Sequence, residues 1–214
     1  MIWCFISQKG GCGKSTLAVH AAAWQASKGR SVLLIDADSQ RSSSGWLAEA
    51  HLAGVECVTA EDADQLRRRC QASSANITII DGAGGISPTT RQALVLADLA
   101  IIPSGASALD LRAARHAVEL VHQARLVRDN KAPACRLVLN RVQLHTTLGA
   151  EALDAIRTLG EPAARAVIRQ RTALADAAGQ GVVVFGMGSA AADAAADLHA
   201  LFLELQRVPT PQTV

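Results

Sequence analysis

Aromatic residues are scarce in this chain of 214 residues, which has three Trp, three Phe and no Tyr. Half of its residues are nevertheless hydrophobic, with many Ala, Leu and Val. That balance excludes a disordered chain and suits helices packed on a buried sheet. The length allows one well-buried α/β domain and is short for two.

The cysteines form no recognisable set. There are five of them, and no two have the C-x-x-C spacing, which argues against both a disulfide framework and a zinc site. Cys12 stands apart because it lies in a glycine-rich loop before a helix, a position that can make a thiol sensitive to oxidation. A tolerated small residue is the favoured interpretation of Cys12, and a redox role is the alternative.

Strong charge and long apolar runs are also missing. The formal net charge of +2 is too small to indicate nucleic-acid binding, so any DNA contact requires a local cluster of arginines. No apolar run approaches the roughly 20 residues of a membrane span. The first expected strand begins at residue 2, which leaves no room for a signal or transit peptide, and we expect a cytoplasmic protein.

A glycine-rich stretch follows the first apolar run, residues 2–6. It reads Lys9-Gly10-Gly11-Cys12-Gly13-Lys14-Ser15-Thr16 and precedes a helical segment. Closely spaced glycines let the backbone turn its N–H groups inward, where they and the helix N-terminus bind phosphate. Lys14 supplies a charge for the outer phosphates, and the Ser15 hydroxyl is placed to ligate Mg²⁺. The stretch is a phosphate loop, and all residues from Gly10 to Thr16 are candidate nucleotide ligands.

The loop departs from the usual G-x-x-x-x-G-K-[ST] pattern in an informative way. Gln8 stands where the first glycine is expected, and Lys9 is an additional lysine. The form K-G-G-x-G-K-[ST]-T resembles the deviant Walker A motif of the ParA/MinD group of ATPases. The resemblance implies that Lys9 reaches across an ATP-sandwiched dimer to the nucleotide of the partner, and it makes Lys9 and Lys14 candidate catalytic residues.

Two acidic motifs follow later strands. Asp36-Ala37-Asp38-Ser39-Gln40 ends an apolar run, and carboxylates two residues apart at a strand end point to the same side. The motif resembles the D-x-D-P-Q element of the same ATPases, with Ser39 replacing proline, which implies that Asp38 orients the attacking water and Asp36 holds the Mg²⁺ shell. Asp81 ends the run 77–81, resembles a Walker B aspartate that binds Mg²⁺ through water, and precedes a glycine-rich switch loop.

Strands and helices are expected to alternate along the chain. Strand-like runs lie at 2–6, 31–35, 55–59, 77–81, 99–103, 136–141 and 166–168, and helical segments at 17–28, 42–53, 61–71, 107–127, 149–159 and 189–206. Every phosphate-site motif follows a strand. We predict a doubly wound, mostly parallel α/β sheet with helices on both faces, forming one domain over 1–207 with a short polar tail at 208–214.

Two residues are candidates for contact with the nucleotide base. Asn140 ends a strand that lies near the base in the similar ATPases, so the resemblance implies an adenine contact. Trp46 lies in the helical segment 42–53, where packing against the sheet is favoured over stacking on a base.

Arginines near residue 170 are candidates for DNA contact. The small ParA-type, ParF-like subgroup also shows a short strand and an R/T-Q-R element, here Arg169-Gln170-Arg171. Arg169 and Arg171, with Arg141 and Arg165, would form a phosphate-contacting surface across the dimer. Pairing with carboxylates, or closing of the nucleotide pocket, is an equally weighted alternative. The run 67–69 is also basic, but a solvated helix face is its favoured interpretation.

The resemblance spans nearly all of residues 1–207 and implies a switch. It implies a slow Mg²⁺-dependent ATPase that forms a homodimer with ATP, binds non-specific DNA on the nucleoid, and is stimulated by a ParB-like or other adaptor. Its cargo would be a plasmid, a chromosome region or a protein organelle such as a carboxysome. The alternative is a MinD-like switch at a membrane or protein surface. The last helix has a neutral to acidic polar face, which disfavours membrane targeting, and the chain lacks the cysteine pair expected of a metal-insertion ATPase.

Overall fold

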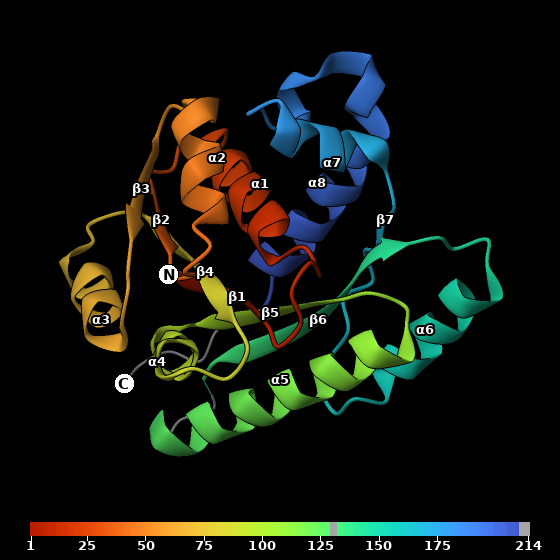
Figure 1. Ribbon diagram of the computed structural model, residues 1–214, viewed down its shortest axis with the longest axis horizontal. Coiled ribbons are helices and arrows are strands. Elements are labelled where there is room, and N and C mark those ends of the chain that lie inside the picture. Colours follow the sequence, from red (N-terminus) through yellow and green to blue (C-terminus); the bar gives the residue numbers. More distant parts are fainter. Residues whose placement is uncertain (129–131, 210–214) are drawn as a thin grey trace.

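A single parallel sheet forms the centre of the computed structural model, which describes residues 1–128 and 132–209 (Figure 1). The strand order is β3-β2-β4-β1-β5-β6-β7, and every pairing is parallel. Its strands are β1 (Ile2–Ser7), β2 (Val32–Asp36), β3 (Val55–Thr59), β4 (Ile77–Gly84), β5 (Leu99–Ser104), β6 (Ala134–Val142) and β7 (Ile168–Arg169). The predicted doubly wound fold is confirmed.

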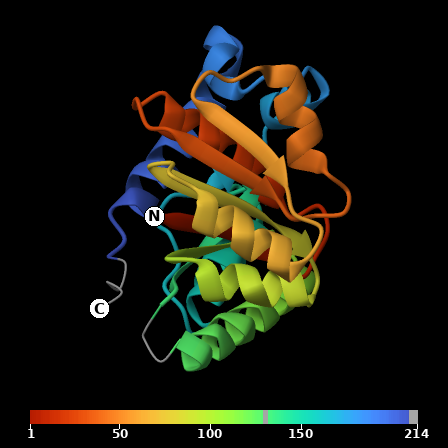
Figure 2. The ribbon, with the colours of Figure 1, turned by 90° about the vertical axis from the view of Figure 1, so that its left-hand side faces the viewer.

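Helices cover both faces of the sheet (Figures 1 and 2). One face carries α1 (Lys14–Ala26), α2 (Ser42–Ala50), α7 (Thr172–Gly179) and α8 (Ala192–Gln206), and the other carries α3 (Ala63–Ala72), α4 (Pro88–Leu96), α5 (Ala108–Arg128) and α6 (Thr147–Arg157). Alternate side chains of β1 enter the two cores, Trp3 and Phe5 on one side and Cys4 and Ile6 on the other. A strand buried on both faces explains why the sequence shows continuous apolar runs.

The two edges of the sheet are closed differently. At the β7 edge, the Glu204 carboxylate of α8 accepts hydrogen bonds from the backbone N–H groups of Arg165 and Ala166, both at 3.0 Å. Asp197, also on α8, accepts from the N–H of Arg169 at 3.3 Å. A helix therefore satisfies edge N–H groups that a further strand would otherwise bind. At the other edge, β3 pairs with β2 and with no other strand of residues 1–128 and 132–209.

β4 is longer than the sequence suggested. We expected it to end at Asp81, but it continues to Gly84 and pairs there with Ser7 of β1. Gly82 allows this, because a Cβ atom at this position would lie 2.8 Å from the carbonyl oxygen of Phe5. The glycines thus bring β1 and β4 close together and extend the sheet under the phosphate loop.

Two short helices and a break in the last one were not predicted. α4 begins with Ser87, whose side chain accepts from the N–H of Thr90 at 3.0 Å, followed by proline at the first helical position. α7 follows directly after the arginine-rich segment, and the sequence predicted no helix there. The expected helix 189–206 is divided into a 3₁₀ turn (Gly188–Ala191) and α8.

The first residue of the expected polar tail packs against the core. Val208, in the segment expected to be a polar tail, is 6% exposed and belongs to the core shared by α1 and α8. Residues 210–214 of that expected tail lie outside the described residues. In the part of the chain that the structure describes, no helix has the length and hydrophobicity needed to cross a bilayer.

Candidate nucleotide-binding site

The phosphate loop joins β1 to α1 at the carboxyl edge of the sheet. Gly11 and Gly13 have φ angles of 72° and 96°, which only glycine adopts readily. No side chain caps the N-terminus of α1, so its first N–H groups are available to an anion. Lys14, Ser15 and Thr16 lie in the first turn of this helix, which begins three residues earlier than the sequence suggested.

Two residues of β6 hold the loop in place. The Asn140 Nδ2 donates to the carbonyl oxygen of Cys12 at 2.7 Å, and the Nη1 of Arg141 donates to that of Gly11 at 2.7 Å. Arg141 has a positive φ of 60° at a register shift between β6 and β7, which turns its side chain over the loop. Asn140 is 3% exposed and lines the cavity described next, so its predicted adenine contact remains a prediction, while its contact with Cys12 was not foreseen.

A cavity of about 1160 Å³ opens over the loop. Its walls come from the phosphate loop, the segment after β2, α2, the end of β6, and the β7–α7 segment, and include Lys14, Asp38, Gly84, Asn140, Gln143, Gln170 and Thr172. Lys14 is only 6% exposed but contributes to the wall. The volume suffices for a ligand of nucleotide size.

The two buried aspartates lie side by side on neighbouring strands. Asp36 of β2 and Asp81 of β4 are register partners, 1% and 0% exposed. Neither carboxylate oxygen of Asp81 has a hydrogen-bond partner among the described residues. Burial raises the pKa of Asp81 to about 7, and the charge of Asp36 acts in the same direction, whereas Ser15, Ser43 and Lys14 oppose the shift.

Asp36 and Asp38 have separate sets of partners. The oxygens of Asp36 accept from the backbone N–H groups of Asp38 at 3.1 Å and Ser44 at 2.8 Å, so this carboxylate stabilises the start of α2. Asp38 accepts from the N–H of Gly84 at 3.2 Å and lines the cavity. Of the predicted pair, Asp38 is thus the one that faces the cavity and contacts the end of β4.

The side chains at this site fit a magnesium ion that takes some of its ligands from the protein and others from bound phosphate. Within residues 1–128 and 132–209, no three His, Cys, Asp or Glu side chains form a cluster able to hold a metal by themselves. Mg²⁺ typically takes one or two carboxylates together with substrate phosphates and water. The unpartnered buried carboxylate of Asp81, close to Ser15 at the start of α1, has the chemistry that such an ion requires.

Lys9 is bound within its own chain in this structure. Its Nζ lies 2.5 Å from Oδ1 of Asp110 near the start of α5, and 44% of its side chain is exposed. A second cavity of about 650 Å³ lies beside this pair, between the phosphate loop and the segments that begin α5 and α6. For Lys9 to contact another subunit, as predicted, its side chain must leave Asp110.

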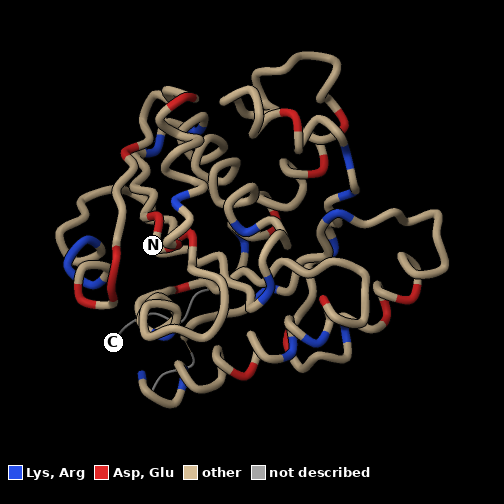
Figure 3. Tube along the Cα trace, in the orientation of Figure 1, with Lys and Arg blue, Asp and Glu red and all other residues tan. Residues whose placement is uncertain are grey.

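The four candidate DNA-binding arginines do not share one environment. Arg171 donates from Nε to Asp197 at 3.1 Å and from Nη1 to Asp193 at 2.8 Å. Arg169 lies 3.7 Å from Asp197 with half of its side chain exposed, and Arg165 is exposed without a described ion-pair partner. Figure 3 shows several basic segments, in blue, along the part of the tube where Figure 1 labels β7. Arg171 therefore pairs with carboxylates of its own chain, which was the alternative to a DNA contact.

A buried histidine ties the loop helix to a distant segment, which the sequence did not indicate. The Nδ1 of His20 lies 2.7 Å from the Thr16 carbonyl oxygen, and its Nε2 accepts from the N–H of Val184 at 3.2 Å. Trp46 packs against the His20 ring, donates to the carbonyl of Val182 at 2.9 Å and also lines the cavity. The predicted packing role of Trp46 is present, and one edge of the residue reaches the site.

Comparison with known families decides the assignment of this loop. A family model described as "CobQ/CobB/MinD/ParA nucleotide binding domain" matches residues 3–184. The chain belongs to this family. The match spans every motif described above, from the phosphate loop through Asp38 and Asp81 to the arginine-rich segment, and it confirms the resemblance seen in the sequence.

Several members of the family are similar to this chain over nearly their full length. The chain is 34% identical to maintenance of carboxysome distribution protein A of Gloeobacter kilaueensis over 94% of this chain and 92% of the relative. It is 27% identical to the protein of the same name from Halothiobacillus neapolitanus, over 92% of each. The fold is that of Cyanothece McdA(D38A), solved as a complex with ATP. The TM-score is 0.79, the sequence identity is 17%, and the similarity covers 99% of this chain and 98% of that one.

Proposed function

We propose that this protein is a Mg²⁺-dependent ATPase that acts as a dimerisation switch and positions a cargo inside the cell. The observation that carries the proposal is the cavity of about 1160 Å³, whose walls combine the glycines of the phosphate loop with Lys14, Ser15 and Asp38. Membership of a nucleotide-binding family supports the same ligand class.

Each residue of the site has a chemical role in this proposal. The first N–H groups of α1 and the Lys14 ammonium bind the phosphates, and Ser15 with Asp81 would hold Mg²⁺, which when bound neutralises charge on the β- and γ-phosphates. Asp38 faces the cavity and is held by the N–H of Gly84. Its carboxylate orients the attacking water and accepts its proton.

The switch depends on Lys9. ATP in two facing sites would draw this side chain away from Asp110 and toward the phosphates of the partner, which closes the dimer. The exposure of Lys9 beside the loop supports this path, because an exposed ion pair contributes little free energy and is easily exchanged. Hydrolysis, stimulated by an adaptor protein of the ParB type or another kind, then reopens the dimer.

The cargo we favour is a carboxysome or a similar protein assembly, because two relatives are named for carboxysome distribution and match over most of their length. We propose that the ATP dimer holds to the nucleoid in the cytoplasm through non-specific DNA contacts. Arg165 and Arg169 are exposed, and their side chains donate no hydrogen bond within the described residues, so they would contact phosphates, while Arg171 fixes the segment and Arg141 braces the loop.

ATP turnover tests the enzymatic part. Purified protein should release phosphate from ATP slowly in the presence of Mg²⁺. Asp38→Ala should lower the rate at least about a hundredfold, as is typical for a lost proton acceptor. Lys14→Ala should lower it by a similar factor, about a hundredfold, because the charge that stabilises the phosphates is lost. Lys28→Ala, an exposed change just beyond the opposite end of α1, is the control. Unchanged turnover in both site variants would refute the proposed roles.

DNA binding tests the switch. Anisotropy of a labelled random duplex should rise with ATP but not with ADP, weaken with salt, and disappear in Lys9→Ala. Each of Arg165→Ala and Arg169→Ala should reduce the slope of log affinity against log salt by about 1, as expected for one phosphate contact. Arg157→Ala, whose side chain pairs only with Asp154, should leave the slope unchanged.

A MinD-like switch at a membrane or protein surface is the second candidate. The observation that favours it is that two of the four arginines, Arg141 and Arg171, are already engaged within the chain. ATP-dependent dimerisation without any gain in DNA binding would support this candidate and exclude nucleoid tethering.

A further inference from the structure

The edge strand β3 is open, and Glu56 is its one charged residue. Its sequence, Val55-Glu56-Cys57-Val58-Thr59, is rich in β-branched residues and contains no proline, no lysine and no bulge. No segment of the described chain pairs with its outer side. An open edge of this kind presents free N–H and C=O groups and accepts another strand.

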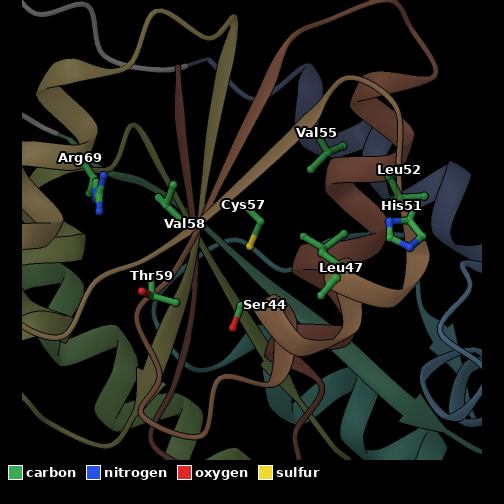
Figure 4. A pocket seen from close by; sticks show the side chains of 10 residues that line it. Ser44, Leu47, His51, Leu52, Val55, Cys57, Val58, Thr59 and Arg69 are labelled. Atoms are coloured by element: carbon green, nitrogen blue, oxygen red, sulfur yellow. The ribbon is translucent and has the colours of Figure 1, made fainter.

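A groove of about 560 Å³ runs along this edge (Figure 4). On one side of the strand, Cys57 and Val55 lie next to Leu47 of α2, whereas Val58 faces Arg69 of α3 on the other side. No residue of β3 is fully buried. The edge therefore has two partly apolar walls that a docked strand would cover.

The charges beside the groove are complementary to one another. Alternation along the strand places Glu56 on the same face as Val58, the face on which Arg69 lies. Glu56 and Arg69 are both exposed, and neither forms an ion pair or a side-chain hydrogen bond within the described residues. Each copy of the chain thus offers one unpaired anion and one unpaired cation along the same edge.

We propose that this edge binds the β3 edge of a second copy of the chain, antiparallel and centred on Cys57. In this register Cys57 lies opposite Cys57 of the partner subunit, and Val58 lies opposite Glu56 of the partner subunit. The partner's glutamate then meets Arg69, and the two-fold axis repeats the pair. Such self-complementarity favours a second copy over an unrelated peptide, because one set of residues supplies both halves of each contact.

This contact is separate from the nucleotide site. β2 and β4 lie between β3 and β1, the strand that leads into the phosphate loop. The edge contact needs no nucleotide, so it stands or falls independently of the proposed ATPase. If ATP also joins subunits through the loop face, two different two-fold contacts on one chain generate an open row of subunits.

Oxidative cross-linking of the full chain without nucleotide tests the register. Copper-phenanthroline should produce a disulfide-linked dimer that Cys57→Ser abolishes, since opposed residues in an antiparallel pair have Cα atoms about 5 Å apart. In the Cys57→Ser background, Val55→Cys should not form a disulfide between the two copies of position 55. In this register those two positions lie four residues, or about 13 Å, apart along the strands. Val55→Cys should cross-link when mixed with Thr59→Cys, its opposite in this register. Equal self-linking of the position 55 and 57 cysteines would overturn the proposal.

A charge exchange tests the partner. Glu56→Arg and Arg69→Glu, both at exposed positions, should each reduce the Cys57-linked fraction about fivefold, because each places like charges opposite one another twice. The double variant should recover the wild-type fraction. Failure of that recovery, or the absence of any Cys57-dependent dimer, would overturn docking of a second copy and leave the edge to a strand from another protein.

Discussion

The buried His20 predicts a specific loss of stability in acid. Burial lowers the pKa of this imidazole from 6.5 to about 4, because the charged form is poorly solvated between α1 and the 3₁₀ turn Val184–Gly186. The neutral ring also accepts from the N–H of Val184, which a protonated ring cannot do. Between these two pKa values, His20 is therefore protonated in the unfolded chain and neutral in the folded one.

The direction and size of the stability change follow from the pKa of His20 in the unfolded and folded chains. The contribution of His20 to stability is complete above pH 6.5 and is lost as the pH falls toward 4, because only the unfolded state is protonated in that window. At pH 5 the loss is about 2 kcal/mol, and below pH 4 it approaches about 3 kcal/mol. Urea unfolding followed by circular dichroism at pH 8 and pH 5 measures it directly.

The comparison that isolates His20 uses two variants. His20→Gln removes the titrating group, so its free energy of unfolding should fall by about 2 kcal/mol less than that of the wild type between pH 8 and pH 5. His145→Gln, in an exposed loop, should keep the full pH dependence. The reasoning is refuted if all three proteins lose the same stability. If His20→Gln does not fold, the imidazole pKa measured by NMR in the wild type decides the matter.

Two further predictions concern the site and its support. Gly13→Ala should reduce ATP affinity at least about tenfold and destabilise the fold by about 1–3 kcal/mol, because its φ of 96° is strained for alanine and the added Cβ would overlap Asn140. Gly179→Ala, in open space and outside the cavity wall, should do neither, as calorimetry and urea unfolding would show. Asp197→Asn should cost about 2 kcal/mol by weakening the charge-assisted hydrogen bond from Arg171, whereas Asp193→Asn, at an exposed carboxylate, should cost less than about 1 kcal/mol; equal losses in urea unfolding would contradict this ranking.

The sheet and the phosphate-loop motifs were predictable because their signals are local. A strand buried on both faces is a continuous apolar run, and Gly13 with Lys14 marks the turn from strand to helix within a few residues. The placement of Asp38 at the cavity wall follows from the same order of strands, because carboxyl ends of parallel strands share an edge.

Contacts between distant segments were not predictable. Asp197 looked like part of a solvated helix face, yet it is 9% exposed because Arg171, 26 residues away, neutralises it. The contact of Asn140 with Cys12 spans 128 residues and leaves no trace in spacing. Only α4 had an unused local signal, the Ser-Pro start at residues 87 and 88.

The capping of β7 by α8 has a consequence for the order in which the protein becomes functional. The phosphate loop is synthesised before α8, but the wall of the cavity at Arg169 and Arg171 is held by Asp197 of that helix. Chains fold from the N-terminus as they emerge. A nascent chain therefore has its phosphate-binding turn long before it has a complete pocket, and that pocket is complete only after α8 has been synthesised.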